Sequence, residues 1–153
     1  MDIKQRKPNR LKNFNYGQNG SYFITLCTKE RKKILSTIVG DDAHIVPSKC
    51  GKIIEKHIKN VPEIKKYVIM PDHIHMIIEL NNGTMWASSP TNKIPNIVRT
   101  LKILTTKELG QSIFQRSYYD HVIRNQDDYN IVWEYIENNP KKWILANNKA
   151  QGD

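Results

Sequence analysis

The stretch YVIMPDHIHMIIEL, residues 67–80, constrains the fold more than any other part of the sequence. It holds two short strand-like runs on either side of Pro71 and Asp72, a pair that suits a tight connection between antiparallel strands. Because side chains alternate along a strand, one face of the second run is continuously apolar. That face consists of Ile74, Met76, Ile78 and Leu80. The pattern predicts a sheet that helices cover on this side.

His73 and His75 project from the opposite face of the same strand, side by side. Neutral imidazole is a common metal ligand, and two of them leave room for a third protein group, water and substrate oxygens. An H-x-H pair also arises by chance in a chain with five histidines, so the motif alone is a weak signal. A metal site and a pair of ordinary strand histidines both stay open. We expect both rings on the open side of the sheet, where a substrate can reach them.

The other segments complete a recognisable order of elements. Strands are expected over residues 21–28 and 116–124, and helices over residues 48–61, with Ser48 as N-cap, and over residues 96–109. A last helix is expected from near Asp127 until Pro140 ends it. Residues 40–47 and 81–95 are expected to be loops. The first six elements have the order of the ferredoxin-like split βαβ fold, an α+β fold whose antiparallel sheet carries two helices on one face. The C-terminal helix is an addition to it.

Length and composition limit the class of protein. A chain of 153 residues is the size of one domain, which we place at residues 21–145, between a basic arm at 1–20 and a polar tail at 146–153. No apolar run approaches the roughly 18 to 20 residues that a membrane span needs. Cys27 and Cys50 form no CxxC pair, and the N-terminus lacks the apolar core of a secretory signal, so we expect a reducing cytoplasm. The net charge of +9 indicates a polyanionic partner, with nucleic acid favoured.

The last predicted helix contributes a second group of polar side chains. Tyr135 and Asn139 lie one turn apart, beside the apolar stripe of that helix. An amide oxygen is a hard ligand suited to Mg²⁺ or Mn²⁺, and a phenol can act as a nucleophile. A boundary tyrosine and a helix C-cap before Pro140 are the alternatives for these two residues. His121 is a rival third ligand or a packed strand histidine, and His57 is interpreted as a packed or half-exposed structural histidine instead of a ligand.

Four separated motifs resemble one known family. They are VIMPDHIHMIIEL, IVRTLKILTTKELG, FQRSYYDHVIRNQDDY and EYIENNPKKW, and together with the first strand they span residues 22–143. Their order and spacing are similar to those of the single-tyrosine HUH transposases, in particular the REP-associated tyrosine transposase branch. The resemblance implies a ferredoxin-like fold and site-specific cleavage of single-stranded DNA at hairpin-containing ends. It also implies a 5′-phosphotyrosine intermediate, a free 3′-hydroxyl and subsequent strand transfer.

Carried over by position, the resemblance assigns roles to four residues. His73, His75 and Asn139 correspond to the metal ligands, with Mg²⁺ or Mn²⁺ as the expected ion, and Tyr135 corresponds to the nucleophile. Full transposases of this kind work as dimers that exchange the tyrosine helix, whereas the REP-associated branch includes the alternative of a monomer. Predicted DNA contacts are Arg10, Lys12, Tyr16, Trp86, Arg99, Lys102, Arg116 and Arg124.

Two other functions remain to be weighed against a DNA-nicking enzyme. A non-catalytic single-stranded nucleic-acid-binding module can share the ferredoxin-like fold, although this sheet lacks the RNP1-like aromatic run of such modules. A small zinc hydrolase requires a third strong ligand, and Asn139 is a poor ligand for zinc. The sequence holds no phosphate-binding glycine loop.

Overall fold

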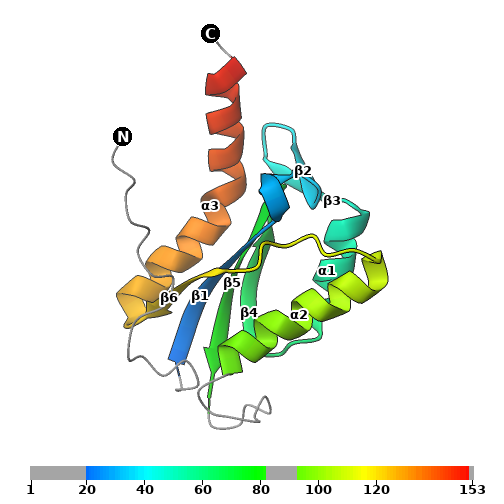
Figure 1. Cartoon of the computed structure of the whole chain (residues 1–153). Helices are drawn as coiled ribbons and strands as arrows, with labels where there is room; N and C mark the ends of the chain where they lie inside the picture. The colour runs from blue at the N-terminus through cyan, green and yellow to red at the C-terminus, as the bar shows by residue number, and fades with distance from the viewer. Residues whose placement is uncertain (1–19, 82–92, 152–153) are drawn as a thin grey trace, which may run out of the picture.

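The computed structural model describes residues 20–81 and 93–151 (Figure 1). The elements in chain order are β1 (Gly20–Cys27), the 3-10 helix η1 (Lys29–Arg31), β2 (Ser36–Val39), β3 (His44–Pro47), α1 (Lys49–Lys59), β4 (Ile64–Ile69), β5 (His73–Leu80), α2 (Lys93–Leu109), β6 (Tyr119–Ile123) and α3 (Gln126–Gln151). Within the described ranges, no helix is both long and apolar enough to cross a membrane.

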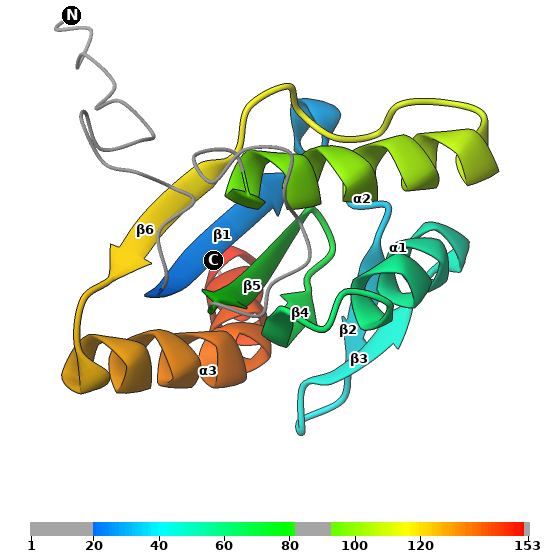
Figure 2. The same cartoon turned by 90° about the horizontal axis from the view of Figure 1, so that it is seen from below.

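The main sheet confirms the predicted α+β, ferredoxin-like architecture. Its strands have the order β4-β5-β1-β6, and every neighbouring pair is antiparallel. Helices α1 and α2 cover one face of this sheet, and α3 lies on the opposite face (Figure 2). Strand β5 is therefore central, between β4 and β1, and the register places Thr25 opposite His75 and Cys27 opposite His73.

The alternation predicted along β5 is confirmed. Ile74, Met76 and Ile78 are fully buried in the apolar cluster beneath α1 and α2. The histidine face differs from the prediction, because it is not open: α3 crosses it and buries both rings. The apolar side chains of α3, which include Val132 and Ile136, become buried by packing against this second face of the sheet.

Several element boundaries follow local chemistry. Ser48 caps α1 as predicted, because its hydroxyl accepts a hydrogen bond from the Gly51 amide at 3.1 Å. Helix α2 begins at Lys93, earlier than predicted, since Pro95 lies in the first turn, where its missing N–H costs nothing. Strand β6 is shorter than the predicted residues 116–124. Of the predicted loop at 81–95, residues 82–92 lie outside the described residues, as do residues 1–19 of the predicted arm.

The prediction that residues 40–47 form a loop was wrong. Strands β2 and β3 form an antiparallel hairpin that pairs residues 36–39 with residues 44–47. Gly40 at φ 79° and Ala43 at φ 54° supply the left-handed backbone of its turn. The segments STIV and HIVP on either side of Gly-Asp-Asp-Ala carry the β-branched signal for this hairpin.

The prediction that Pro140 ends the last helix was also wrong. Helix α3 continues to Gln151 with Pro140 inside it, and it bends between its orange and red halves (Figure 1). Proline removes one backbone hydrogen bond and disfavours the helix interior, and a bend is the usual result. Ile136 before the proline and Trp143 after it pack against the same apolar cluster. This shared packing on both sides offsets the cost and holds the helix together across Pro140.

Candidate active site

His73 and His75 lie together on the α3 face of β5. Their ring centroids are 4.5 Å apart, with an angle of 67° between the ring planes. Only 8% and 6% of their surfaces are exposed, so both are buried polar groups. Buried imidazoles need partners for their ring nitrogens, and the neighbouring strand and turn provide them.

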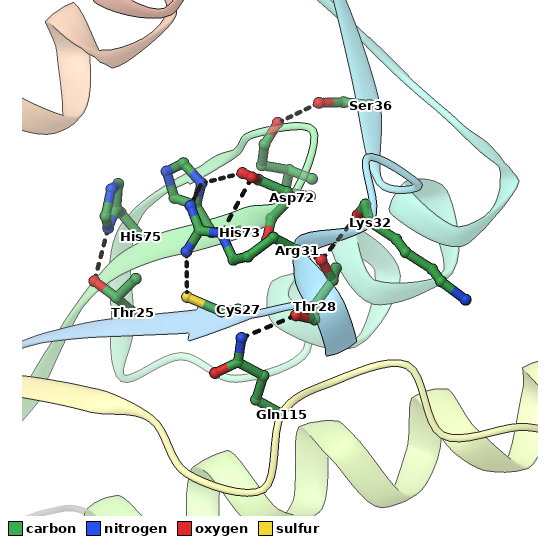
Figure 3. Close-up of polar contacts among 11 residues, drawn as sticks. Thr25, Cys27, Thr28, Arg31, Lys32, Ser36, Asp72, His73, His75 and Gln115 are labelled. Carbon is green, nitrogen blue, oxygen red and sulfur yellow. Dashed lines mark hydrogen bonds and ion pairs between the residues drawn. The ribbon is translucent and has the colours of Figure 1, made fainter.

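Each ring has its Nδ1 atom engaged, as Figure 3 shows. Asp72 Oδ1 lies 2.6 Å from Nδ1 of His73, and because a carboxylate only accepts, Nδ1 carries the proton. Thr25 Oγ1 lies 2.8 Å from Nδ1 of His75, its register partner across β1 and β5. Nε2 is then the ring nitrogen left on each side chain for a metal ion. Such outer partners orient metal-binding histidines, and the carboxylate also fixes the tautomer of His73.

The environment keeps His75 neutral. Burial, followed by the nearby His73 and the Arg31 guanidinium, lowers the pKa of His75 from 6.5 to about 3. Neutral imidazole is the form that binds metal, so no proton has to be removed from His75 at neutral pH.

Arg31 completes the network around His73. Its Nε donates to Asp72 Oδ2 at 3.1 Å, Nη1 donates to Cys27 Sγ at 2.8 Å, and Nη2 lies 3.5 Å from Nδ1 of His73 (Figure 3). The backbone of Arg31 has φ 53°, a left-handed conformation that costs a residue with a Cβ about 1 to 2 kcal/mol. The contact with Asp72 offsets that cost and anchors the carboxylate beside His73.

Sequence reasoning missed Arg31, Thr25 and the second role of Asp72. Arg31 lies in the charge run KERKK, which is typical of a solvated surface, and Asp72 was interpreted only as a turn residue. Thr25 carried a usable signal, because its position in the first strand makes it a cross-strand neighbour of the histidine pair once β1 and β5 are paired.

Tyr135 lies against His75. The two ring centroids are 5.3 Å apart in an edge-on arrangement, and Phe23 contacts both rings, with centroid distances of 5.1 Å to His75 and 5.9 Å to Tyr135. Tyr135 is 41% exposed, in contrast to the histidines. Lys142 lies two turns further along the same face of α3, with Nζ 5.1 Å from the Tyr135 ring centroid. The phenol is thus next to the histidine pair and open to solvent.

Asn139 lies on the same row of α3, between Tyr135 and Trp143. Tyr135 contacts His75, and the Trp143 ring lies 6.3 Å from the His73 ring, so the row runs along the histidine pair. Asn139 is only 8% exposed, and its Nδ2 donates to the Tyr135 carbonyl at 3.3 Å. Because this hydrogen bond uses the side-chain nitrogen of Asn139, Oδ1 is the side-chain atom that remains to bind a metal ion.

The donor set fits a hard or borderline divalent cation better than zinc. Among the residues that the structure describes, no group of three or more His, Cys, Asp or Glu side chains is arranged to hold a metal ion. Two imidazoles and one amide oxygen, completed by water or phosphate oxygens, suit Mg²⁺ or Mn²⁺. His121 is not the third ligand: it faces Asp128, with 2.9 Å between Nε2 and Oδ2. His57 is buried in α1, 3.0 Å from Glu108, as a packed helical histidine.

The predicted DNA contacts divide into three groups. Arg99, Lys102 and Arg116 line one pocket of about 410 Å³ between α2 and the segment before β6, where Lys102 donates to the carbonyls of Gln115 and Arg116. Arg124 lines a different pocket, at the far end of β6. The remaining four predicted contacts, Arg10, Lys12, Tyr16 and Trp86, lie outside the described residues. The role of all eight residues in DNA binding stays a prediction.

Comparison with known proteins places the chain in a family. Residues 17–139 match the family described as "Transposase IS200 like". The chain belongs to this family. The predicted relationship to single-tyrosine transposases is thereby confirmed, and this IS200-like transposase is an enzyme of that class.

Individual relatives agree with this assignment. The IS200-like transposase is 31% identical to an uncharacterised protein of Haemophilus influenzae (strain ATCC 51907 / DSM 11121 / KW20 / Rd), over 92% of this chain and 91% of that protein. It is 29% identical to a REP-associated tyrosine transposase of Escherichia coli (strain K12), over 84% of this chain and 72% of the relative. A solved structure of a REP-associated tyrosine transposase bound to a REP hairpin superimposes with a TM-score of 0.57 and 25% identity, covering 87% of this chain and 73% of the other.

Proposed function

We propose that this transposase nicks single-stranded DNA at hairpin-containing ends and transfers the strand, with Tyr135 as nucleophile and a divalent metal ion as cofactor. The observation that carries the proposal is the edge-on contact of the Tyr135 ring with His75, at 5.3 Å between centroids. It brings a solvent-exposed phenol to a buried pair of metal-competent imidazoles. A hairpin as the DNA partner is supported by the relative whose structure holds a REP hairpin.

The reaction is an in-line exchange at phosphorus. The phenolic oxygen of Tyr135 forms a bond to the backbone phosphorus while the bond from phosphorus to the neighbouring 3′ oxygen breaks. The phenolic proton passes to solvent, and the departing 3′ oxygen takes up a proton. The products are a 5′-phosphotyrosine and a free 3′-hydroxyl. Because the phosphodiester linkage is conserved, a 3′-hydroxyl of another strand reverses the step and joins without ATP.

The chain's own residues prepare the phosphate for attack. His73 and His75 through Nε2, and Asn139 through Oδ1, are the proposed ligands of Mg²⁺ or Mn²⁺. When bound, such a cation supplies polarisation of the non-bridging phosphate oxygens. Asp72 and Thr25 orient the two rings through Nδ1, and Arg31 holds Asp72. Phe23 packs against both His75 and Tyr135, which limits the movement of the nucleophile.

We further propose that the site is assembled in cis. Tyr135 and the histidine pair already meet within one chain, so a monomer carries the full set of proposed groups. A homodimer that exchanges α3 is the alternative. Mixing Tyr135→Phe protein with His75→Ala protein distinguishes the two, because exchange in trans restores one intact site. A mixture that forms adduct contradicts assembly in cis.

The nucleophile is tested by trapping the covalent intermediate. The full chain is incubated with Mg²⁺ or Mn²⁺ and a single-stranded oligonucleotide that carries a hairpin and its flanks from the DNA beside the gene. A protein–DNA adduct on a denaturing gel is expected, lost in Tyr135→Phe and in EDTA. Tyr119→Phe is the matched control, because Tyr119 is 39% exposed, close to the 41% of Tyr135. An adduct that persists in Tyr135→Phe overturns the assignment, and salt-sensitive binding without any adduct supports the non-catalytic binding module instead.

A further inference from the structure

A second pocket lies at the end of the sheet away from the histidine pair. Its volume is about 300 Å³, at the small end of the range for ligand sites. It is formed where β1 begins and β5 and β6 end, against the first turn of α3. The residues that line it include Ser21, Glu79, Arg124, Asn125, Gln126 and Tyr129.

The pocket shares its two walls with the candidate active site. Glu79 and His75 project from the same face of β5, separated by about 13 Å at the usual rise of a strand. Tyr129 and Tyr135 both lie on α3, separated by about 9 Å along the helix. The two sites therefore lie roughly 9 to 13 Å apart along the same strand and helix, so a single DNA strand that passes Tyr135 reaches this pocket within a few nucleotides.

The lining offers donors, acceptors and an aromatic ring in a small space. The Glu79 carboxylate makes no hydrogen bond or ion pair with any described residue, and the Arg124 guanidinium is exposed. Asn125 Oδ1 caps α3 by accepting from the Asp128 amide at 2.8 Å, so Nδ2 of Asn125 remains as a donor for a ligand. Gln126 Nε2 donates to Asn130 Oδ1 at 2.9 Å, so Oε1 of Gln126 remains as an acceptor for a ligand. These are the mixed polar groups that read the edge of a base.

Tyr129 forms the aromatic wall. Its ring stacks on Trp133, with 6.0 Å between centroids and 25° between planes, so its position is fixed from behind. Burial, and next the negative charge of Glu79, raise the pKa of Tyr129, which agrees with the carboxylate and the phenol sharing one pocket. Fixed aromatic rings beside a strand path are the usual stacking platforms for unpaired bases.

We propose that this pocket binds one unpaired nucleobase of the DNA strand that Tyr135 attacks. The inference rests on the proposed function and adds a base-reading subsite to it. A phosphate fits poorly, because Glu79 lines the pocket and Asp127 and Asp128 occupy the first turn of α3. A neutral base satisfies both the carboxylate and the guanidinium. Since a carboxylate needs donors, and an exocyclic amino group supplies two N–H donors whereas thymine has only its N3–H, bases with an amino group are expected to bind better than thymine.

Binding of short strands with a single base tests this subsite directly. The probes are pentanucleotides in which only the central residue carries a base and the others are abasic, plus a fully abasic strand of equal charge. They are titrated in EDTA into the ¹⁵N-labelled full chain, with the amides of Ser21 and Gln126 as reporters. We expect strands with adenine, guanine or cytosine to bind about 5-fold or more tighter than the abasic strand, the low end of one stacked base. Thymine is expected to bind more weakly than these three.

Variants connect the base preference to the named residues. Glu79→Gln is expected to remove the discrimination against thymine, and Tyr129→Leu to reduce the gain of every base over the abasic strand. Asp41→Asn is the matched control, because it removes one carboxylate from the exposed turn of the β2–β3 hairpin and is expected to change neither. Equal binding of abasic and base-bearing strands, reporters that do not shift, or a preference that survives Glu79→Gln overturns the proposal.

The outcome is separate from that of the nicking test. The titration needs neither metal nor Tyr135, so a base preference in EDTA supports the subsite even where no covalent adduct forms. Conversely, an adduct at Tyr135 together with equal binding of all five strands supports the proposed function and removes this inference alone.

Discussion

The two faces of the central sheet differ in what they bury. Beneath α1 and α2, the side chains of β5 are Ile74, Met76, Ile78 and Leu80, within the larger apolar cluster. Beneath α3, the alternate side chains of the same strand are His73, His75, Ile77 and Glu79, and only Ile77 joins the smaller apolar cluster. One eight-residue strand therefore serves a purely apolar interface and a mixed one at the same time.

The difference shows how a small domain separates stability from chemistry. Burial of apolar area on the α1/α2 face supplies the hydrophobic stabilisation, which is roughly proportional to the area removed from water. Burial of imidazoles on the α3 face requires hydrogen-bond partners, which Asp72 and Thr25 provide. Substitutions on neighbouring residues of β5 should consequently have opposite effects on stability and on activity.

The largest expected effect is on activity at His75. His75→Ala removes a proposed metal ligand and is expected to lower the rate of adduct formation at least about 100-fold, because metal polarisation of a phosphoryl oxygen is worth several kcal/mol. The rate is measured with the hairpin oligonucleotide at saturating Mg²⁺ or Mn²⁺. Circular dichroism should show a folded protein. A folded variant with an undiminished rate would remove His75 from the metal site.

Met76 is the opposite case, one residue further along the strand. It is fully buried under α1 and α2, so Met76→Ala is expected to lower the free energy of unfolding by about 2 to 5 kcal/mol. Urea denaturation followed by fluorescence measures the change. At a temperature where the variant is folded, adduct formation should persist. A loss of activity without a loss of stability would contradict the division between the two faces.

The alternation that separates these faces could be predicted from the sequence, because the period of a strand is two and depends only on neighbouring residues. The order of the main-sheet strands and of the α-helices followed from the same local patterns, although the β2–β3 hairpin did not. Tyr135 and Asn139 were placed on one row of a helix for the same reason, by the period of 3.6 residues. The structure brings this row to the histidine pair, which the sequence pattern alone left open.

Two of the features that escaped prediction depend on distant contacts, whereas the missed β2–β3 hairpin is local. Pro140 predicts a helix end by its local chemistry, and only the packing of Ile136 and Trp143 against the sheet keeps α3 continuous. Arg31 has no distinctive neighbours in the sequence, and its role arises from a bond to Asp72, 41 positions away. In both cases a tertiary contact outweighs a local preference.

A smaller effect is expected at Asp72, which supports the chemical face without contacting the proposed metal ion. Asp72→Asn weakens the acceptor for His73 Nδ1 and the ion pair with Arg31, so we expect metal affinity to fall about 10- to 100-fold. Isothermal titration with Mn²⁺ measures the affinity. Arg31→Gln should also lower the affinity for Mn²⁺, and Asp41→Asn should leave it unchanged. Unaltered affinity in Asp72→Asn would show that the carboxylate does not orient His73.

The smallest expected effect concerns Tyr67, a polar contact at the margin of the apolar face. Its hydroxyl donates to Glu55 Oε2 at 3.0 Å, and burial, followed by this hydrogen bond and the charge of Glu55, raises the pKa of Tyr67 from 10 to about 12. Tyr67→Phe is expected to lower the free energy of unfolding by about 0.5 to 1.5 kcal/mol near neutral pH, the usual range for one hydrogen bond.

The pH dependence of that difference identifies its cause. Because the folded-state pKa of Tyr67 is raised, its contribution is fully present below pH 10 and is lost as pH rises from about 10 to about 12. The gap in stability between wild type and Tyr67→Phe should therefore be constant up to pH 10 and shrink above it, as measured by urea denaturation at each pH. A gap that does not change with pH would indicate lost packing instead of a lost hydrogen bond. In that case the Tyr67–Glu55 hydrogen bond would contribute nothing measurable to the stability of the α1/α2 face.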